Sequence, residues 1–181
     1  MSLELVSAIA AIGTFVVIAA TAFAAIVQLH HLRGGNQIVA LTEIREVVES
    51  EKFVAARRFL VEELPSLMKE PGFKEGLKGQ LLDRRLEPAI YIGNVFENLG
   101  TLVKYRIIER DIACDLWGGV VTTSWASLQP FTVLRRQRAG PWGALWENFE
   151  YLAVLSEDFY NSHPQGAYPD GVRRMPQTPP G

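Results

Sequence analysis

The chain has 181 residues, of which 48% are apolar, and its 18 Lys and Arg against 20 Asp and Glu give a formal net charge of −2. The length suits one domain with an appendage, and the apolar fraction excludes a wholly disordered chain. A charge this near zero argues against a nucleic-acid binder, which would carry a basic excess. The single cysteine, Cys114, excludes an internal disulfide and a thiolate metal cluster.

The N-terminal segment carries the strongest signal, because residues 5–27 contain no charged side chain. A helix of these 23 residues is about 34 Å long, which exceeds the roughly 30 Å of bilayer hydrocarbon. We therefore predict a retained transmembrane anchor over residues 4–32. A cleaved signal peptide is the alternative. Against it, no Lys or Arg precedes the apolar run, and the run is longer than a typical signal-peptide core.

Flanking charge predicts the orientation of this anchor. Glu4 precedes the apolar run, whereas His30, His31 and Arg33 follow it. The positive-inside rule then places a short N-terminus outside and the C-terminal domain in the cytoplasm, at the inner (plasma) membrane.

Four polar residues recur at every seventh position of the anchor: Ser7, Thr14, Thr21 and Gln28. A 3.5-residue repeat keeps one face toward a partner helix, and small or hydroxyl side chains allow close approach within a membrane. The pattern predicts a self-association seam, or docking onto another membrane protein. The alternative is chance in an Ala-rich segment, with each hydroxyl bonded to its own helix backbone.

Residues 36–161 show helical periodicity and no sustained strand-like alternation. Gly34 and Gly35 are expected to end the anchor helix, and Pro65 and Pro130 to end or kink later helices. Residues 65–80 are expected to form a loop with at most one short helix. Helices are predicted at about 37–49, 51–64, 84–104, 112–129 and 142–160.

These elements predict an all-α protein in which one N-terminal transmembrane helix precedes a four- to six-helix cytosolic bundle. The expected parts are an anchor at 4–32, a helical domain at 36–161 and a tail at 162–181. The tail holds five of the ten prolines and no apolar periodicity, so it is expected to be disordered.

Several short motifs follow the apolar segment in a fixed order: EKFVAARRFL, VFENLGTLVKYRII, SWASLQPFTVLRRQR and WENFEYLA. This order resembles a widespread bacterial family of small membrane-anchored helical proteins with no assigned function. The resemblance covers about residues 3–158. It implies a single N-terminal anchor and a helical domain, and it implies no activity, cofactor or catalytic residue.

The chain offers few residues for metal or cofactor chemistry. His30 and His31 are adjacent, His163 is distant, and neither Glu-x-x-His nor a nucleotide-binding glycine motif occurs. We therefore expect no metal, no cofactor and no nucleic-acid partner.

A short basic stretch contains Arg135, Arg136 and Arg138. Such a cluster would suit anionic lipid headgroups. A solvated, salt-paired turn is the interpretation that we favour.

Glu97 is the one polar position that we single out, because Gly93 and Gly100 lie on its face of the predicted helix. Two glycines beside a carboxylate allow another backbone to approach. The favoured interpretation is structural, with Glu97 accepting hydrogen bonds from a helix N-terminus, an Arg or an indole N–H. The alternative is a catalytic or ligand-binding acid, with Arg106 or Arg110 as its partner.

The sequence therefore predicts a membrane-anchored helical interaction or assembly module without catalytic activity. Its partners would be membrane lipid and either further copies of itself or another membrane protein. The alternatives are an enzyme or small-ligand binder that uses Glu97, and an accessory subunit of a larger membrane complex.

Overall fold

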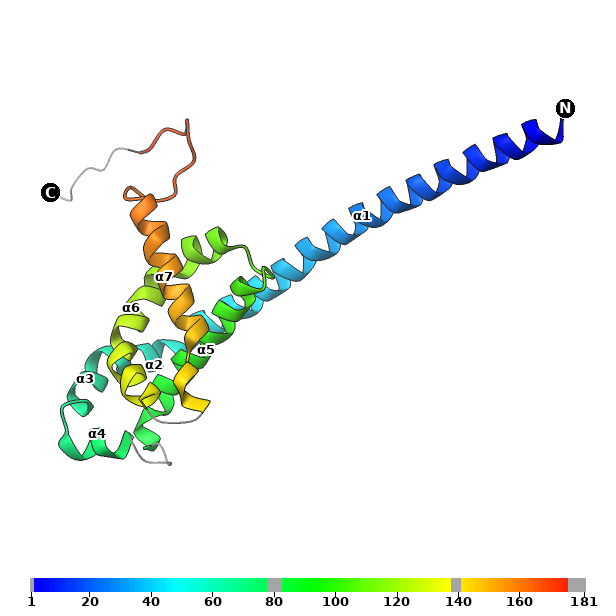
Figure 1. Ribbon diagram of the computed structural model, residues 1–181. Coiled ribbons are helices and arrows are strands. Elements are labelled where there is room, and N and C mark those ends of the chain that lie inside the picture. Colours follow the sequence, from blue (N-terminus) through cyan, green and yellow to red (C-terminus); the bar gives the residue numbers. More distant parts are fainter. Residues whose placement is uncertain (1, 78–82, 138–140, 176–181) are drawn as a thin grey trace. The chain divides into compact units, whose positions relative to one another are not determined.

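The computed structural model describes residues 2–77, 83–137 and 141–175, and the regular elements of this part are all helices (Figure 1). The predicted all-α class is therefore confirmed. Residues 176–181 of the predicted tail lie outside the described part. The helices are α1 (Leu3–Glu49), α2 (Glu51–Glu62), α3 (Leu64–Leu67), α4 (Pro71–Leu77), α5 (Glu87–Lys104), α6 (Arg110–Arg136) and α7 (Glu147–Ser162), with 3₁₀ turns η1 (Arg84–Leu86) and η2 (Pro141–Ala144).

The chain divides into two compact units, Met1–Ile44 and Arg45–Gly181, and α1 makes up nearly all of the first unit. The prediction that this helix ends at Gly34 and Gly35 is wrong, because α1 continues through both residues. A helix-stopping glycine takes a left-handed conformation, and neither residue has a positive φ. Each glycine costs a helix only about 1 kcal/mol relative to alanine, which good helix formers on both sides can offset.

The second unit has a core in which α2, α5, α6 and α7 each contribute an aromatic ring. Phe53 of α2 lies 5.7 Å from Phe96 of α5, measured between ring centroids. Phe149 of α7 lies 5.0 Å from Phe96 and 5.0 Å from Trp125 of α6. Burying each such ring contributes about 1.5–3 kcal/mol, so this chain of contacts holds four helices on one core.

Apolar stripes of α2, α5 and α6 face this core, and Leu64 of α3 continues the stripe of α2. Their spacing of three and four residues puts each stripe on one side of its helix. The buried members are Ala56, Leu60, Leu64, Ala89, Ile92, Leu99, Val103, Trp117, Val121 and Leu128.

Helix α6 is longer than predicted at both ends. Pro130 does not end it, and the helix continues to Arg136 with Pro130 on its exposed side. Proline removes one backbone hydrogen bond, but Phe131 and Thr132 are buried directly after it and keep this turn packed. At the other end, α6 starts at Arg110, so Asp111 lies in the first helical turn, where a carboxylate suits the helix dipole.

Helix α7 starts at Glu147, five residues later than predicted. Trp146 has φ 55° and ψ 41°, a left-handed conformation that a helix cannot contain. Residues 141–144 form η2 instead of a first helical turn.

The segment predicted as a loop after α2 contains α3 and α4. Pro65 lies in the first turn of α3, where proline is tolerated because that N–H has no helical partner.

The favoured interpretation of the basic stretch as a solvated, salt-paired turn is wrong for Arg135, which is buried in the last turn of α6. The Arg135 side chain is 0% exposed, and its Nη1 donates to the Leu77 carbonyl at the end of α4 over 2.7 Å. Arg136 pairs with Glu150. Arg138 lies outside the described residues. The sequence did not predict that Arg135 is buried. The helix was expected to end at about residue 129, whereas Arg135 lies on the buried side of the longer helix.

Candidate functional site

The Glu97 carboxylate holds the N-terminus of α7. Its Oε2 accepts the backbone N–H groups of Asn148 and Phe149, at 3.0 and 2.9 Å. Its Oε1 accepts from the Asn148 side-chain amide at 2.7 Å. The first amides of a helix lack partners within the helix, and an anion there also interacts favourably with the helix dipole. This is the helix N-terminus that the favoured interpretation of Glu97 names.

The two glycines beside Glu97 make room for this contact. A Cβ at Gly100 would lie 2.0 Å from the Asn148 carbonyl oxygen, so the backbone of the first turn of α7 rests directly on α5 there. A Cβ at Gly93 would lie 2.1 Å from the Trp146 indole ring. The expected close approach of another backbone is confirmed at Gly100, whereas an indole occupies the space at Gly93.

Trp146 fixes the entry into α7. Its Nε1 donates to the Asn94 side-chain oxygen at 3.1 Å, and its ring is buried. Its side chain cannot cap the helix, so Glu97 supplies from α5 the acceptor that an N-cap residue normally provides. Lys104 of α5 reaches the same turn, donating to Asn148 Oδ1 at 3.0 Å.

The polar groups around Glu97 hold helix α7 against helix α5. Both Glu97 oxygens are occupied by donors from α7, and the two proposed arginine partners lie elsewhere. Arg110 pairs with Asp111, and within the described residues neither Arg106 nor Arg110 bonds to Glu97. The sequence contained no signal for Asn94 or Asn148, because their role depends on where α7 begins.

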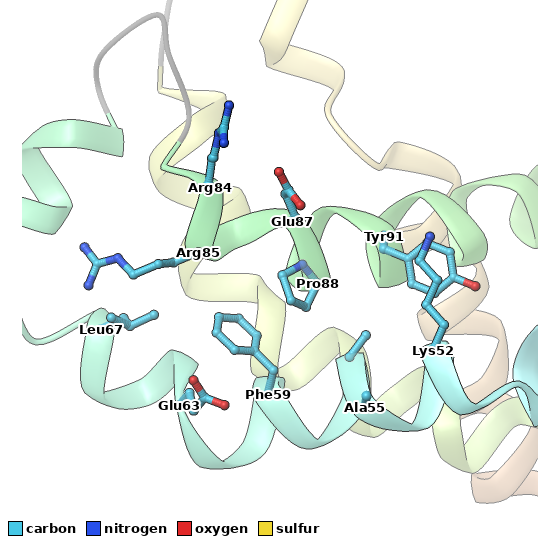
Figure 2. Close-up of a pocket in the computed structure, with 11 residues that line it drawn as sticks. Lys52, Ala55, Phe59, Glu63, Leu67, Arg84, Arg85, Glu87, Pro88 and Tyr91 are labelled. Carbon is cyan, nitrogen blue, oxygen red and sulfur yellow. The ribbon is translucent and has the colours of Figure 1, made fainter.

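A groove that the sequence did not predict lies between α2 and the start of α5, and we name it the α2–α5 groove (Figure 2). Its volume is about 630 Å³, within the range of small-ligand pockets. Figure 2 shows Phe59 of α2 and Pro88 of α5 facing each other across it. The other apolar lining residues are Ala55, Ala56 and Leu67.

The polar residues of the α2–α5 groove carry both signs of charge. Lys52 lies over the Tyr91 ring, 4.3 Å from its centroid. Glu63, Arg84 and Glu87 also line the groove, and no ion pair of theirs is found within the described residues. An apolar wall with charged groups of both signs at its edge suits the binding of an amphipathic molecule.

One end of the α2–α5 groove is held by Arg85. Its Nη2 lies 2.7 Å from Asp83 Oδ2, and its Nη1 lies 3.5 Å from Glu70 Oε2. Hydrogen bonds from Arg85 lower the pKa of the Asp83 carboxyl. The guanidinium also lies 5.3 Å from the centroid of the Phe73 ring, so one residue connects η1 with α4.

The predicted membrane seam lies on one α-helix, as its spacing requires. The Thr14 hydroxyl donates to the Ala10 carbonyl at 2.9 Å, and Thr21 donates to Val17 at 2.7 Å. Ser7 and Gln28 are exposed on the same helix. These are the backbone bonds that the alternative interpretation of the spacing expects, so the seam stays a prediction. Threonines bonded in this way still present a small, uniform surface to a second helix.

One protein-family model matches most of the chain. The model of a domain of unknown function, DUF4760, matches residues 15–155. The chain belongs to this family. No similar protein was found among the curated proteins, and none among the solved structures.

The DUF4760 match starts within the apolar part of α1 and ends within α7. It therefore includes the α2–α5 groove and the Glu97 cluster, and it excludes the predicted tail. The family description names no activity, so it assigns no role to these residues.

Metal-ligating groups do not gather in the described part of this DUF4760 chain, where no three His, Cys, Asp or Glu side chains lie close enough to hold an ion. Cys114 is fully buried. Burial raises the pKa of its thiol, and Ser156 donates a weak hydrogen bond to its Sγ at 3.8 Å. A buried, protonated thiol is a poor nucleophile.

Proposed function

We propose that this DUF4760 chain is an interaction or assembly module without catalytic activity, held at the plasma membrane by residues 4–32. The observation that carries the proposal is the most apolar window of α1, of which 0% is buried among the described residues. A core helix of a soluble protein would be covered by its own domain. An uncovered apolar run of this length gains most from lipid.

The proposed orientation places the N-terminus outside and the helical domain in the cytoplasm. The support is the charge difference across residues 5–27, with Glu4 before them and Arg33 after them.

The non-catalytic part of the proposal is supported by the use that the chain makes of Glu97. The enzyme or ligand-binding alternative requires this carboxylate, yet its oxygens bind the N-terminus of α7. Glu97 is also not among the lining residues of the α2–α5 groove.

Extraction of native membranes with alkaline carbonate tests the anchor. We expect the chain to remain in the membrane pellet with its N-terminal residues intact, as measured by mass spectrometry. Recovery of the chain in the soluble fraction would contradict the proposal. So would a chain cleaved after Ala22 or Ala24, since that result identifies a signal peptide.

Labelling of single cysteines tests the orientation. In a Cys114→Ala background, Tyr168→Cys should react with a membrane-impermeant maleimide only after the cells are opened. Ser2→Cys is the matched control and should react in intact cells. The reverse pattern would show that the helical domain lies outside.

Cross-linking in native membranes tests the assembly. Products at multiples of the chain's own mass indicate self-assembly, and other masses indicate a different membrane protein. Recovery of the single chain alone, at cross-linker levels that capture a known membrane dimer, would contradict the assembly function.

A further inference from the structure

A second groove lies between α2 and α6, and we name it the α2–α6 groove. Its volume is about 320 Å³, and its lining includes Val54, Arg57, Arg58 and Val61 of α2, Val120 of α6, and Val48 from the last turn of α1 at one end. Helix α2 packs on α5 and also contacts α6, and the side of α2 that carries Val54, Arg57, Arg58 and Val61 stays exposed. The groove is therefore a gap in the bundle surface beside an uncovered helix face.

The open face of α2 is apolar and basic. Val54, Arg57, Arg58 and Val61 follow one another at helical spacing on one side of α2. Val54 is 51% exposed and Val61 is 67% exposed. Within the described residues, neither Arg57 nor Arg58 has an ion pair or hydrogen bond, and Glu62 is the one acidic group among the lining residues described.

A smaller pocket of about 70 Å³ shares Arg57 and Val61 with the groove and is also lined by Thr123, Ser124 and Ser127 of α6. Ser124 is 2% exposed, and its hydroxyl has no hydrogen-bond partner within the described residues. Buried hydroxyls are usually satisfied. The α6 wall consists of small side chains at this point, so a second helix can approach closely.

An exposed face of α1 has the complementary chemistry. Val39, Glu43 and Glu46 lie on one side of the helix, next to Ile38. Ile38 is 66% exposed and Val39 is 57% exposed. Glu43 and Glu46 have no ion pair within the described residues, whereas the neighbouring Arg45 is paired with Glu49.

We propose that residues 38–46 of α1 from a second copy of the chain pack into the α2–α6 groove. With the two helices antiparallel, Glu43 then faces Arg57, and Glu46 lies within about one helical turn of both Arg57 and Arg58, whose charge is opposite. The spacing between the valine and the charged residue is also the same on the two helices. Val39 lies four residues from Glu43, and Val61 lies four residues from Arg57, which is about 6 Å along either helix. The inference deepens the proposed assembly function and rests on it.

Disulfide formation between two differently tagged copies tests this contact. One full-length copy carries Val39→Cys and the other Val61→Cys, both with Cys114→Ala, and the two are co-expressed in membranes. We expect a mixed disulfide under mild oxidation. A copy with Asp158→Cys, an exposed position on α7, replaces the Val61→Cys copy as the control and should give little product.

Charge reversal separates the proposed contact from random collisions. Arg57→Glu with Arg58→Glu, placed in the Val61→Cys copy, should lower the yield of mixed disulfide about tenfold. Adding Glu43→Arg and Glu46→Arg to the Val39→Cys copy should restore the yield. Failure of the restored pair to cross-link would overturn the charge pairing on which the contact depends.

The outcomes also distinguish this inference from the assembly function. Copies that cross-link through lysines but give no Val39–Val61 product would still be an assembly, and the α2–α6 contact alone would be refuted. The same result would follow if α1 occupied the groove of its own chain. Copies that give no intermolecular product with either chemistry would refute the self-assembly as well.

Discussion

Glu97 of α5 accepts the backbone N–H of Phe149, in the first turn of α7, at 2.9 Å. Its partner Phe149 also packs against Phe96 and Trp125, so one residue joins the polar cluster to the aromatic core. The carboxylate thus acts as a cap delivered from another helix, and it fixes both where α7 starts and where it lies on α5.

Removing this carboxylate should loosen α7. We expect Glu97→Ala to lower the free energy of unfolding by about 2–4 kcal/mol, because hydrogen bonds to charged groups each contribute about 1.5–3 kcal/mol. Glu97→Gln should cost less, since its amide oxygen can still accept. Denaturant unfolding in detergent, followed by tryptophan fluorescence, measures both. Asn98→Ala, on an exposed position of α5, is the control, and an equal midpoint for Glu97→Ala and this control would contradict the capping role.

A methyl group at Gly100 should displace the start of α7. Its Cβ would lie 2.0 Å from the Asn148 carbonyl oxygen, and this neighbour is backbone that cannot rotate away. We expect Gly100→Ala to destabilise the chain by about 1–3 kcal/mol or more. The matched control is Gly72→Ala in α4, where nothing lies within 4 Å of the added Cβ. A thermal midpoint for Gly100→Ala at or above that of the control would disprove the close approach.

Replacing the proline inside α6 should stabilise the helix. Pro130→Ala restores the backbone hydrogen bond to the Ala126 carbonyl at an exposed position, and we expect a gain of about 1–2 kcal/mol. Pro88→Ala should bring no gain, because Pro88 lies in the first turn of α5, where the N–H has no helical partner. Thermal unfolding of the two variants compares them, and a loss of stability in Pro130→Ala would contradict the continuous helix.

Thiol chemistry should report the burial of Cys114. Because burial raises the pKa of this thiol, the folded chain should react with a disulfide reagent far more slowly than the denatured chain at pH 8. The sign of the pH dependence follows. A thiol whose pKa is higher in the folded state stabilises the fold at pH values below its ordinary pKa. That contribution is lost as the pH rises through the folded pKa. Equal labelling rates for folded and denatured chains would show that Cys114 is accessible.

Bulk on the membrane seam should weaken self-association. Thr14→Leu with Thr21→Leu fills the small surface of the helix, and we expect a loss of about 1 kcal/mol in a membrane dimerisation assay. Val16→Leu, which lies off the seam, should leave association unchanged. Association that is equally strong in both variants would remove the argument from the seven-residue spacing.

The sequence by itself determined the helical class, the apolar run of α1 and the residues that face the core. These features depend on the spacing of residues close together in the chain, since apolar residues at every third and fourth position must lie on one side of a helix. It also singled out Glu97, because two glycines on the same helix face mark a place of close approach. The prediction that Glu97 accepts hydrogen bonds followed from the free-energy cost of burying a carboxylate that has no hydrogen-bond donor.

Only the tertiary structure decided where the helices end and which surfaces stay open. Trp146 takes a left-handed conformation because its indole has a buried site on α5, and Pro130 stays within a helix because its neighbours are packed. Asn148 meets Glu97 only once α7 begins at Glu147. Each groove lies beside a side of α2 that the neighbouring helices do not cover. Such outcomes depend on contacts between residues far apart in the chain, for which local periodicity carries no information.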